Sequence, residues 1–292
     1  MKNSVINLST ILIPVDFSLK TDVAIKKAAD LSRWGEIGLH LLHVANPGHG
    51  PKHSFRLWEI EKEFVELQEK IQVRYPQLRV KTHILQGHSI QKMIIDCVHL
   101  LEPSLIIIGK TDPPRPWSLF RSISPDAIAN KSNCPVLTVK PGSAESKTRV
   151  ILLPVCNFVP ERKLEWAILL ARKYRAQVHL LAIQSPQAAK EWPLPQVFLR
   201  AYDLLRENLH QPIEYYLTDQ QNAAQATLNY AKEIMADMIV VNPKTESSAF
   251  GIAGYRHLSD LLRRDSTIQV LDVEPYKMSK LSGMFPAAQL SL

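Results

Sequence analysis

The feature that most constrains this sequence is an internal repeat. Four short apolar segments of the first half recur in the same order in the second half, the first of them 140 residues later. The pairs are residues 11–16 and 151–156, 39–44 and 178–183, 104–109 and 237–242, and 134–139 and 268–273. An interval of this length indicates a duplicated domain, because solenoid repeats recur about every 20–50 residues.

Each repeated segment is rich in Ile, Val and Leu without polar alternation, which is typical of strands buried on both faces of a parallel sheet. Between them, Ser18 is placed to cap a helix and Pro160 suits a first helical position. Helical periodicity appears near residues 54–74, 89–100, 192–209 and 221–235. Strands and helices therefore alternate twice over, which predicts an α/β protein with two tandem doubly wound domains.

The chain of 292 residues is long enough for two domains. We expect a first domain over residues 1–141, a second over 148–274, and a tail over 275–292. Residues 141–147 are polar, contain Pro and Gly, and read as the linker. The tail carries apolar side chains, so it is expected either to fray or to dock on its own body or on a neighbouring chain.

Composition narrows the classes of function. Hydrophobic residues make up 46% and charged residues 22%, which excludes disordered and fibrous proteins. No apolar stretch approaches the roughly 18 residues of a membrane span. The three cysteines, Cys97, Cys134 and Cys156, are too few and too widely spaced for a disulfide framework or a zinc cluster, so we expect a reducing cytoplasm. The net charge of +7 favours anionic partners but lacks the dense basic runs of nucleic-acid-binding segments, so neither a membrane nor a nucleic acid is an expected partner.

Taken in order, the repeated segments resemble the universal stress protein family. The resemblance covers residues 8–140 closely and 148–273 more loosely. It rests on residues 11–18 as first strand and turn, 41–44 as second strand, and 105–109, a helix near 123–131 and 134–137 as the carboxyl-terminal third. The resemblance implies a flavodoxin-like five-stranded parallel sheet in each copy and side-by-side pairing of the copies. That pairing would join the final strands, residues 135–139 and 268–273, whose backbone groups would otherwise be unpaired.

Some members of that family bind ATP, and the resemblance carries half of their site onto this chain. Pro14, Asp16 and Val44 stand at the positions that contact adenine and ribose in those members. Gly109 stands at the position of the first glycine of their phosphate-binding loop. The chemistry is sensible, because a carboxylate at a strand end can accept hydrogen bonds from both ribose hydroxyls.

The phosphate half of the motif, which has the pattern Gly-x-x-Gly, nine residues, Gly and then Ser or Thr, is altered. Asp112 replaces the second glycine, Ser122 stands at the third, and Ile123 follows where a hydroxyl residue is expected. Such loops hold phosphate through backbone N–H groups at close approach, which glycine permits and a bulkier residue obstructs.

Three prolines, Pro113, Pro114 and Pro116, remove N–H donors from the same stretch. Arg115 and Arg121 could compensate in part, because a guanidinium clasps phosphate oxygens in bidentate fashion. We therefore expect a degenerate triphosphate site in the first copy. In the second copy Cys156 takes the place of Asp16 and residues 242–246 replace the glycine-bearing loop start, so we interpret that copy as a structural or dimerising partner.

The resulting hypothesis is a cytoplasmic tandem universal stress protein that acts as a non-enzymatic stress-response or regulatory factor, with an unknown protein partner and with a homodimer as a further assembly. The alternative is an adenine-nucleotide module that holds AMP, ADP or ATP with Pro14, Asp16, Val44, Gly109, Arg115, Arg121 and Ser122. A slow ATP hydrolase is a third reading, which would need a general base or bound magnesium beside a phosphate.

Histidines and cysteines complete the search for reactive groups. His40 and His43 are three residues apart in a strand, so they point to opposite faces and cannot share a metal, and no metal site is predicted. Cys97 and Cys134 read as packing residues. Cys156, at a strand end, is either a small apolar filler or a reactive thiol.

Overall fold

The computed structural model describes residues 6–110, 123–143, 147–156, 158–183, 194–219, 222–243, 248–249, 256–262 and 266–275. The first half contains β1 (Thr10–Pro14), α1 (Leu19–Leu31), β2 (Gly38–Ala45), α2 (Pro51–Arg74), β3 (Arg79–Gln86), α3 (Ile90–Leu101), β4 (Leu105–Gly109), α4 (Pro125–Ser132) and β5 (Val136–Val139). Two short 3-10 turns, Ser32–Trp34 and Pro141–Ser143, follow α1 and β5. The half thus begins and ends with a strand.

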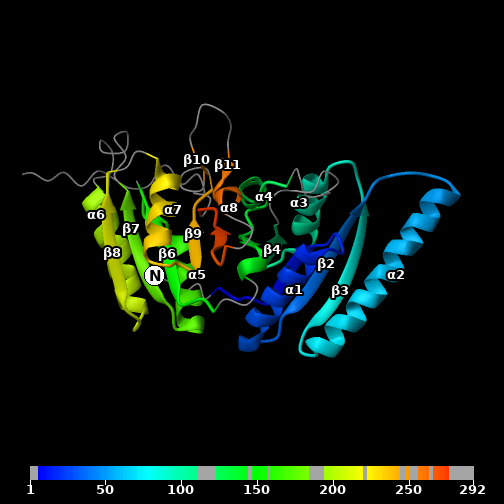
Figure 1. Ribbon diagram of the computed structural model, residues 1–292, viewed down its shortest axis with the longest axis horizontal. Helices are drawn as coiled ribbons and strands as arrows, with labels where there is room; N and C mark the ends of the chain where they lie inside the picture. Colours follow the sequence, from blue (N-terminus) through cyan, green and yellow to red (C-terminus); the bar gives the residue numbers. More distant parts are fainter. Residues whose placement is uncertain are drawn as a thin grey trace, which may run out of the picture.

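The second half repeats this order of elements. It contains β6 (Val150–Val155), α5 (Glu161–Tyr174), β7 (Gln177–Ile183), α6 (Leu194–Asn208), β8 (Ile213–Thr218), α7 (Ala223–Glu233), β9 (Met238–Val241), α8 (Leu258–Leu261) and β12 (Gln269–Asp272). Between β9 and α8, β10 (Ser248–Ala249) and β11 (Arg256–His257) form a separate antiparallel pair. Figure 1 shows the two halves side by side along the longest axis of the molecule.

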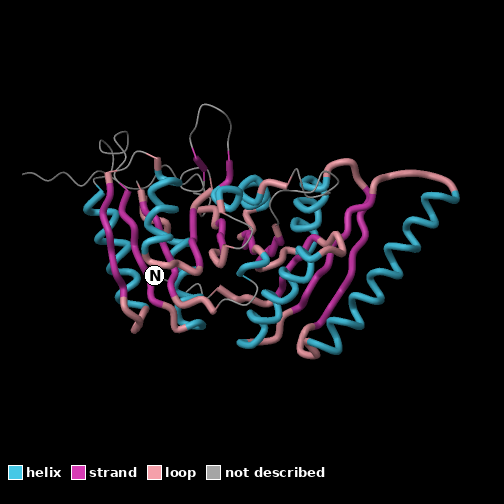
Figure 2. The backbone as a smooth tube through the Cα atoms, viewed as in Figure 1, coloured by secondary structure: helices cyan, strands magenta, loops and turns pink. Residues whose placement is uncertain are grey.

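One sheet runs through both halves (Figure 2). It has ten strands in the order β3-β2-β1-β4-β5-β12-β9-β6-β7-β8. Neighbouring strands within each half are parallel, whereas β5 and β12 pair antiparallel, with Leu137 opposite Leu271 and Thr138 opposite Val270. The strands of the two halves therefore run in opposite directions. The carboxyl ends of the strands of one half lie level with the amino ends of the strands of the other.

The α/β fold and the five-stranded parallel sheet of each half, flanked by helices, are confirmed. The repeated segments of the sequence correspond to β1 and β6, β2 and β7, β4 and β9, and β5 and β12. Ser18 caps α1, as predicted, because its Oγ accepts a hydrogen bond from the Lys20 N–H at 3.3 Å. Pro160 is the residue before α5 and not its first helical residue. The tail from residue 276 onward lies outside the described residues.

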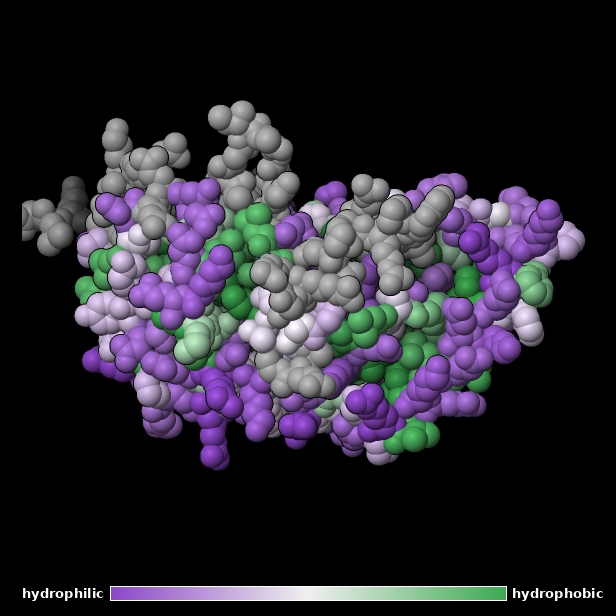
Figure 3. Space-filling view, viewed as in Figure 1, coloured by the Kyte–Doolittle hydropathy of each residue, from purple (hydrophilic) through white to green (hydrophobic). Residues whose placement is uncertain are grey.

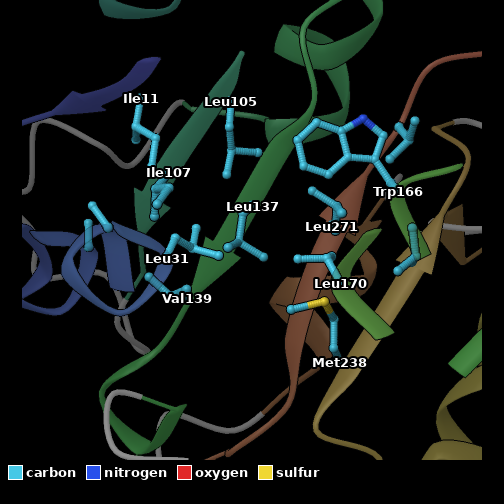
Figure 4. Packing of buried hydrophobic residues seen from close by; sticks show 14 of the residues in the cluster. Ile11, Leu31, Leu105, Ile107, Leu137, Val139, Trp166, Leu170, Met238 and Leu271 are labelled. Carbon is cyan, nitrogen blue, oxygen red and sulfur yellow. The ribbon is translucent and has the colours of Figure 1, made fainter. Parts of the chain in front are cut away.

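Among the described residues, one hydrophobic cluster extends across both halves, and it lies on one face of the sheet. There, α1, α2, α5 and α6 cover the cluster, which extends across β5 and β12. Figure 4 shows Leu137 and Leu271 at its centre, with Ile107 on the side of the first half and Leu170 on the side of the second. On the opposite face, α3 and α4 cover one cluster and α7 and α8 another.

Polar contacts across the junction centre on the buried Lys27 of α1. Its Nζ donates a hydrogen bond at 2.8 Å to the hydroxyl of Tyr174 at the end of α5, and that hydroxyl donates at 2.6 Å to a carboxylate oxygen of Asp30. The ring of Trp34 packs edge-on against Tyr174. Burial lowers the pKa of Lys27 from 10.5 to about 8, although Asp30 favours the charged form.

Further polar contacts join the halves. Arg162 of α5 donates at 2.9 Å to the carbonyl oxygen of Asn133, the residue that ends α4 in a left-handed conformation. Lys110, after β4, donates at 2.6 Å to Asp260 of α8. The first half thus receives a charged side chain from the second, and the second half receives one from the first.

The lowered pKa of Lys27 predicts a pH-dependent stability. The unfolded chain binds a proton at this site up to about pH 10.5, whereas the folded chain releases it above about pH 8, so the free energy of unfolding rises with pH in that window. Relative to Lys27→Met, the wild type should gain about 2 kcal/mol between about pH 7 and pH 9.5. Urea unfolding at several pH values measures this gain.

The control for this experiment is Lys62→Met, since Lys62 is exposed on α2. Its difference from the wild type should not change with pH. A constant difference for Lys27→Met as well would contradict the placement of Lys27 at the junction.

Candidate functional site

The candidate site is the crevice where β1 and β4 separate. The two strands pair at Ile11–Leu105 and Leu12–Ile106, and beyond these pairs β4 continues alongside β5 as far as Gly109. The chain leaves β1 toward α1 on one face of the sheet, while α3, which leads into β4, lies on the other. This divergence at the carboxyl ends of parallel strands is where α/β proteins bind their ligands.

A proline is tolerated at position 14, at this opening, because no backbone N–H donor is needed there. The backbone N–H of Val15 donates to Leu42 on β2 at 2.8 Å, so the nitrogen of Pro14 faces the β4 side. Since β1 and β4 no longer pair at this level, no hydrogen bond is lost there. Val44, near the end of β2, is buried and lies level with Asp16.

The carboxylate of Asp16 is held by the first turn of α1. Its Oδ1 accepts hydrogen bonds from the Ser18 hydroxyl at 2.5 Å, the Ser18 N–H at 3.2 Å and the Thr21 hydroxyl at 3.3 Å. Its Oδ2 lies 3.5 Å from the Nζ of Lys20. Only 11% of the side chain is exposed, so Asp16 first of all fixes the turn between β1 and α1.

Phe17 makes this turn possible at a conformational cost. Its φ of 54° lies in the left-handed region, which costs a bulky residue about 1 kcal/mol. The ring stacks on His43 with centroids 5.2 Å apart and meets Phe64 of α2 edge-on at 5.1 Å. These contacts hold Phe17 over the end of β2, a position that the sequence did not indicate.

His43 is a neutral neighbour of the site. Its Nδ1 lies 3.1 Å from the carbonyl oxygen of Val15 and therefore acts as the donor. Burial lowers the pKa of His43, an effect that this hydrogen bond and Asp16 oppose. His40 lies on the other face, as predicted, with its Nδ1 2.9 Å from the Nε2 of His83 on β3. In the described part of the chain, no group of three or more potential ligands could hold a metal ion.

Gly109 is required by packing. A Cβ atom at this position would lie 2.1 Å from the carbonyl oxygen of Lys20, because the first turn of α1 presses against the end of β4. The glycine therefore has a structural explanation beside its resemblance to a phosphate-loop residue. Arg115, Arg121 and Ser122, the remaining predicted site residues, lie outside the described residues.

The equivalent crevice of the second half, between β6 and β9, has different chemistry. Cys156 follows β6 and is half-buried against the neighbouring hydrophobic cluster. Asn242 follows β9, and its Nδ2 donates at 2.9 Å to the carbonyl oxygen of Val273. Cys97 and Cys134 are buried, as their interpretation as packing residues requires, and burial raises the pKa of Cys97 to about 11 and that of Cys134 to about 12.

A cavity lies elsewhere, between α1 and α2. Its volume is about 760 Å³, and Figure 3 shows hydrophobic surface between these helices. Its lining includes Val23, Leu67, Ile71 and Pro141, but none of the four described residues of the predicted site. No helix in the described ranges is long and apolar enough to cross a membrane.

Comparison with known proteins agrees with this geometry for the first half. The model of the Universal stress protein family matches residues 7–140. Residues 7–140 are a universal stress protein domain. The match includes β1 through β5 and hence the whole described crevice. Among curated proteins, no sequence matches the chain.

Solved structures share the fold over nearly the full length. A universal stress protein from Archaeoglobus fulgidus DSM 4304 has 16% identity and a TM-score of 0.65, covering 92% of this chain and 99% of its own. A functionally unknown protein from Pseudomonas aeruginosa PAO1 has 19% identity and a TM-score of 0.58, with 94% and 95% covered. The cytoplasmic domain of a prokaryotic cation chloride cotransporter has 12% identity and a TM-score of 0.52, with 91% and 95% covered.

The close approach of α1 to β4 predicts a strong effect of Gly109→Ala in the universal stress protein domain. The added methyl group would collide with the Lys20 backbone, which cannot move without displacing α1, so we expect a loss of about 3 kcal/mol in the free energy of unfolding. Urea unfolding measures this loss. Gly35→Ala is the control, because a Cβ at Gly35 meets nothing within 4 Å. Equal stabilities of the two variants would show that α1 does not rest on Gly109.

Proposed function

We propose that this protein is a cytoplasmic, non-catalytic stress-response factor that works by contact with other macromolecules and not by turnover of a nucleotide. In this proposal the second half is a diverged copy of the universal stress protein domain. The observation that carries the proposal is the state of Asp16: Oδ1 already accepts three hydrogen bonds from the first turn of α1, which leaves it little capacity for ribose hydroxyls.

The phosphate side of the crevice supports the same conclusion. Gly109 is packed against α1, and the segment that follows contains Asp112 and three prolines where a phosphate loop needs N–H donors. A negative charge and missing donors both weaken the binding of a triphosphate.

The divergence of the second half supports a scaffold role for it. Cys156 supplies no carboxylate at the position that Asp16 occupies in the first half. Asn242 stands at the position that Gly109 occupies in the first half, and its side-chain amide donates a hydrogen bond to the carbonyl oxygen of Val273. The second half keeps the order of elements and the strand order of the first while it loses the site's chemistry.

The competing function is adenine-nucleotide binding by the first domain. It is favoured by the position of Asp16 at the opening between β1 and β4, where Oδ2 has one long contact among the described residues, with the Nζ of Lys20 at 3.5 Å. In this alternative, Pro14, Asp16 and Val44 hold the nucleoside, and Gly109, Arg115, Arg121 and Ser122 hold the phosphates.

Calorimetric titration of the purified full chain with AMP, ADP and ATP in the presence of magnesium separates the two functions. We expect no binding at micromolar concentrations, because Oδ1 of Asp16 and the space beside Gly109 are already occupied by contacts within the fold. Micromolar binding that Asp16→Ala abolishes and Ser18→Ala preserves would overturn the proposal. Ser18→Ala is the matched control, since it weakens the same turn without removing the carboxylate.

A further inference from the structure

The two edge strands of the ten-stranded sheet, β3 and β8, differ in how well their side chains protect them against pairing with a strand of another molecule. At one edge, β3 carries Arg79 and Lys81, charged side chains of the kind that discourage edge-to-edge pairing. At the other edge, β8 carries Glu214 as its single charge. Large side chains stand out from β8: Tyr215 is 58% exposed, Tyr216 48% and Leu217 55%. An exposed strand of this composition is a template for another strand.

The backbone of β8 offers hydrogen-bonding groups at this edge. The Val178 N–H on β7 donates to the carbonyl oxygen of Pro212, and Val178 lies opposite Ile213. In a parallel ladder this pattern turns the backbone groups of Glu214 and Tyr216 toward β7. The N–H and C=O groups of Ile213, Tyr215 and Leu217 therefore point outward, where no described strand pairs with them.

Aromatic packing holds the edge rigid from both faces. Tyr215 meets the rings of Phe198 and Tyr202 of α6, with centroids 5.3 and 6.2 Å away. On the other face, Tyr216 stacks on Tyr230 of α7 at 4.9 Å. A strand fixed in this way loses little conformational entropy when it pairs, which favours association.

We propose that two copies of this chain associate through β8, which pairs antiparallel with β8 of the second copy around a two-fold axis at Tyr215. In this register Tyr215 faces its own counterpart, Ile213 faces Leu217, and Glu214 faces Tyr216. The side chains of Ile213, Tyr215 and Leu217 therefore lie beside the same three side chains of the second copy, and the Glu214 carboxylates of the two copies do not stand opposite each other. The outward N–H and C=O groups of Tyr215 then bond to those of the second Tyr215.

The identity of the partner follows from this self-complementarity. When β8 pairs with β8 of a second copy, its single charged residue, Glu214, lies opposite Tyr216 and not opposite another charge. The strand is therefore suited to pair with a second copy of itself. The chain already joins two edges antiparallel at β5 and β12, and there, too, helices of both halves flank the junction on one face. The β8 association makes the same kind of junction between copies. It does not depend on whether the first domain binds nucleotides.

Sedimentation velocity of the full chain over a range of concentrations tests the proposal. The wild type should form a dimer that dissociates on dilution, and Leu217→Lys should sediment as a monomer, because the new charge would lie against Ile213 of the second copy. Val73→Lys is the control, since Val73 is 86% exposed on α2 far along the chain from β8, and it should leave the dimer intact. A wild type that stays monomeric at the highest soluble concentration, or a dimer that persists in Leu217→Lys, would overturn the proposal.

Cross-linking tests the register without weakening the interface by charge. Opposed residues of a hydrogen-bonded antiparallel pair have Cα atoms about 5.5 Å apart, within the range of about 4.4–6.8 Å that a disulfide spans. Tyr215→Cys should give a covalent dimer under mild oxidation, whereas Tyr216→Cys, which faces Glu214, should not. Cross-linking at position 216 and not at 215 would contradict the register around Tyr215.

Discussion

The antiparallel pairing of β5 with β12 is the interaction on which the rest of the structure depends. Each of these strands would be an open edge if its half stood alone, and together they become the centre of one sheet. Their side chains continue a single hydrophobic cluster from Ile107 to Leu170. Around them, Lys27, Arg162 and Lys110 each bond to the opposite half. Because apolar packing, backbone pairing and polar contacts coincide there, the junction commits the two halves to one body.

The same pairing assigns different roles to the two ends of each half. Because the last strand of each half lies at the centre of the sheet, β3 and β8 are its two edge strands. Because the halves are antiparallel, the two crevices lie at opposite ends of the strands. In the first crevice the groups that resemble a nucleotide site are also structural. Asp16 fixes the first turn of α1, and Gly109 admits the backbone of Lys20. A domain can therefore keep these residues for its fold after its ligand chemistry has changed, which is why the resemblance of four positions is weaker evidence for binding than for architecture.

Sequence reasoning recovered the buried strands because the evidence for them is local. Residues such as Leu12 and Leu152 sit in apolar runs, since both faces of their strands are covered. The edge strands β3 and β8 escaped the repeat because Lys81 and Glu214 interrupt such runs. The crevice could be placed, since the carboxyl ends of parallel strands share an edge. The engagement of Asp16 could not, because it depends on the left-handed turn at Phe17, which stacking on His43 and Phe64 supports.

Native-state hydrogen exchange tests the central claim most directly, by comparing amides at the junction with amides deep in each half. If β5 and β12 hold the halves as one body, the amides of Thr138 and Val270, which face each other across the junction, exchange only when the whole chain unfolds, with the same free energy as protected amides of β1 and β6. Exchange at the junction with a distinctly lower free energy, while β1 and β6 stay protected, would mean that the halves separate as folded units and would contradict the account.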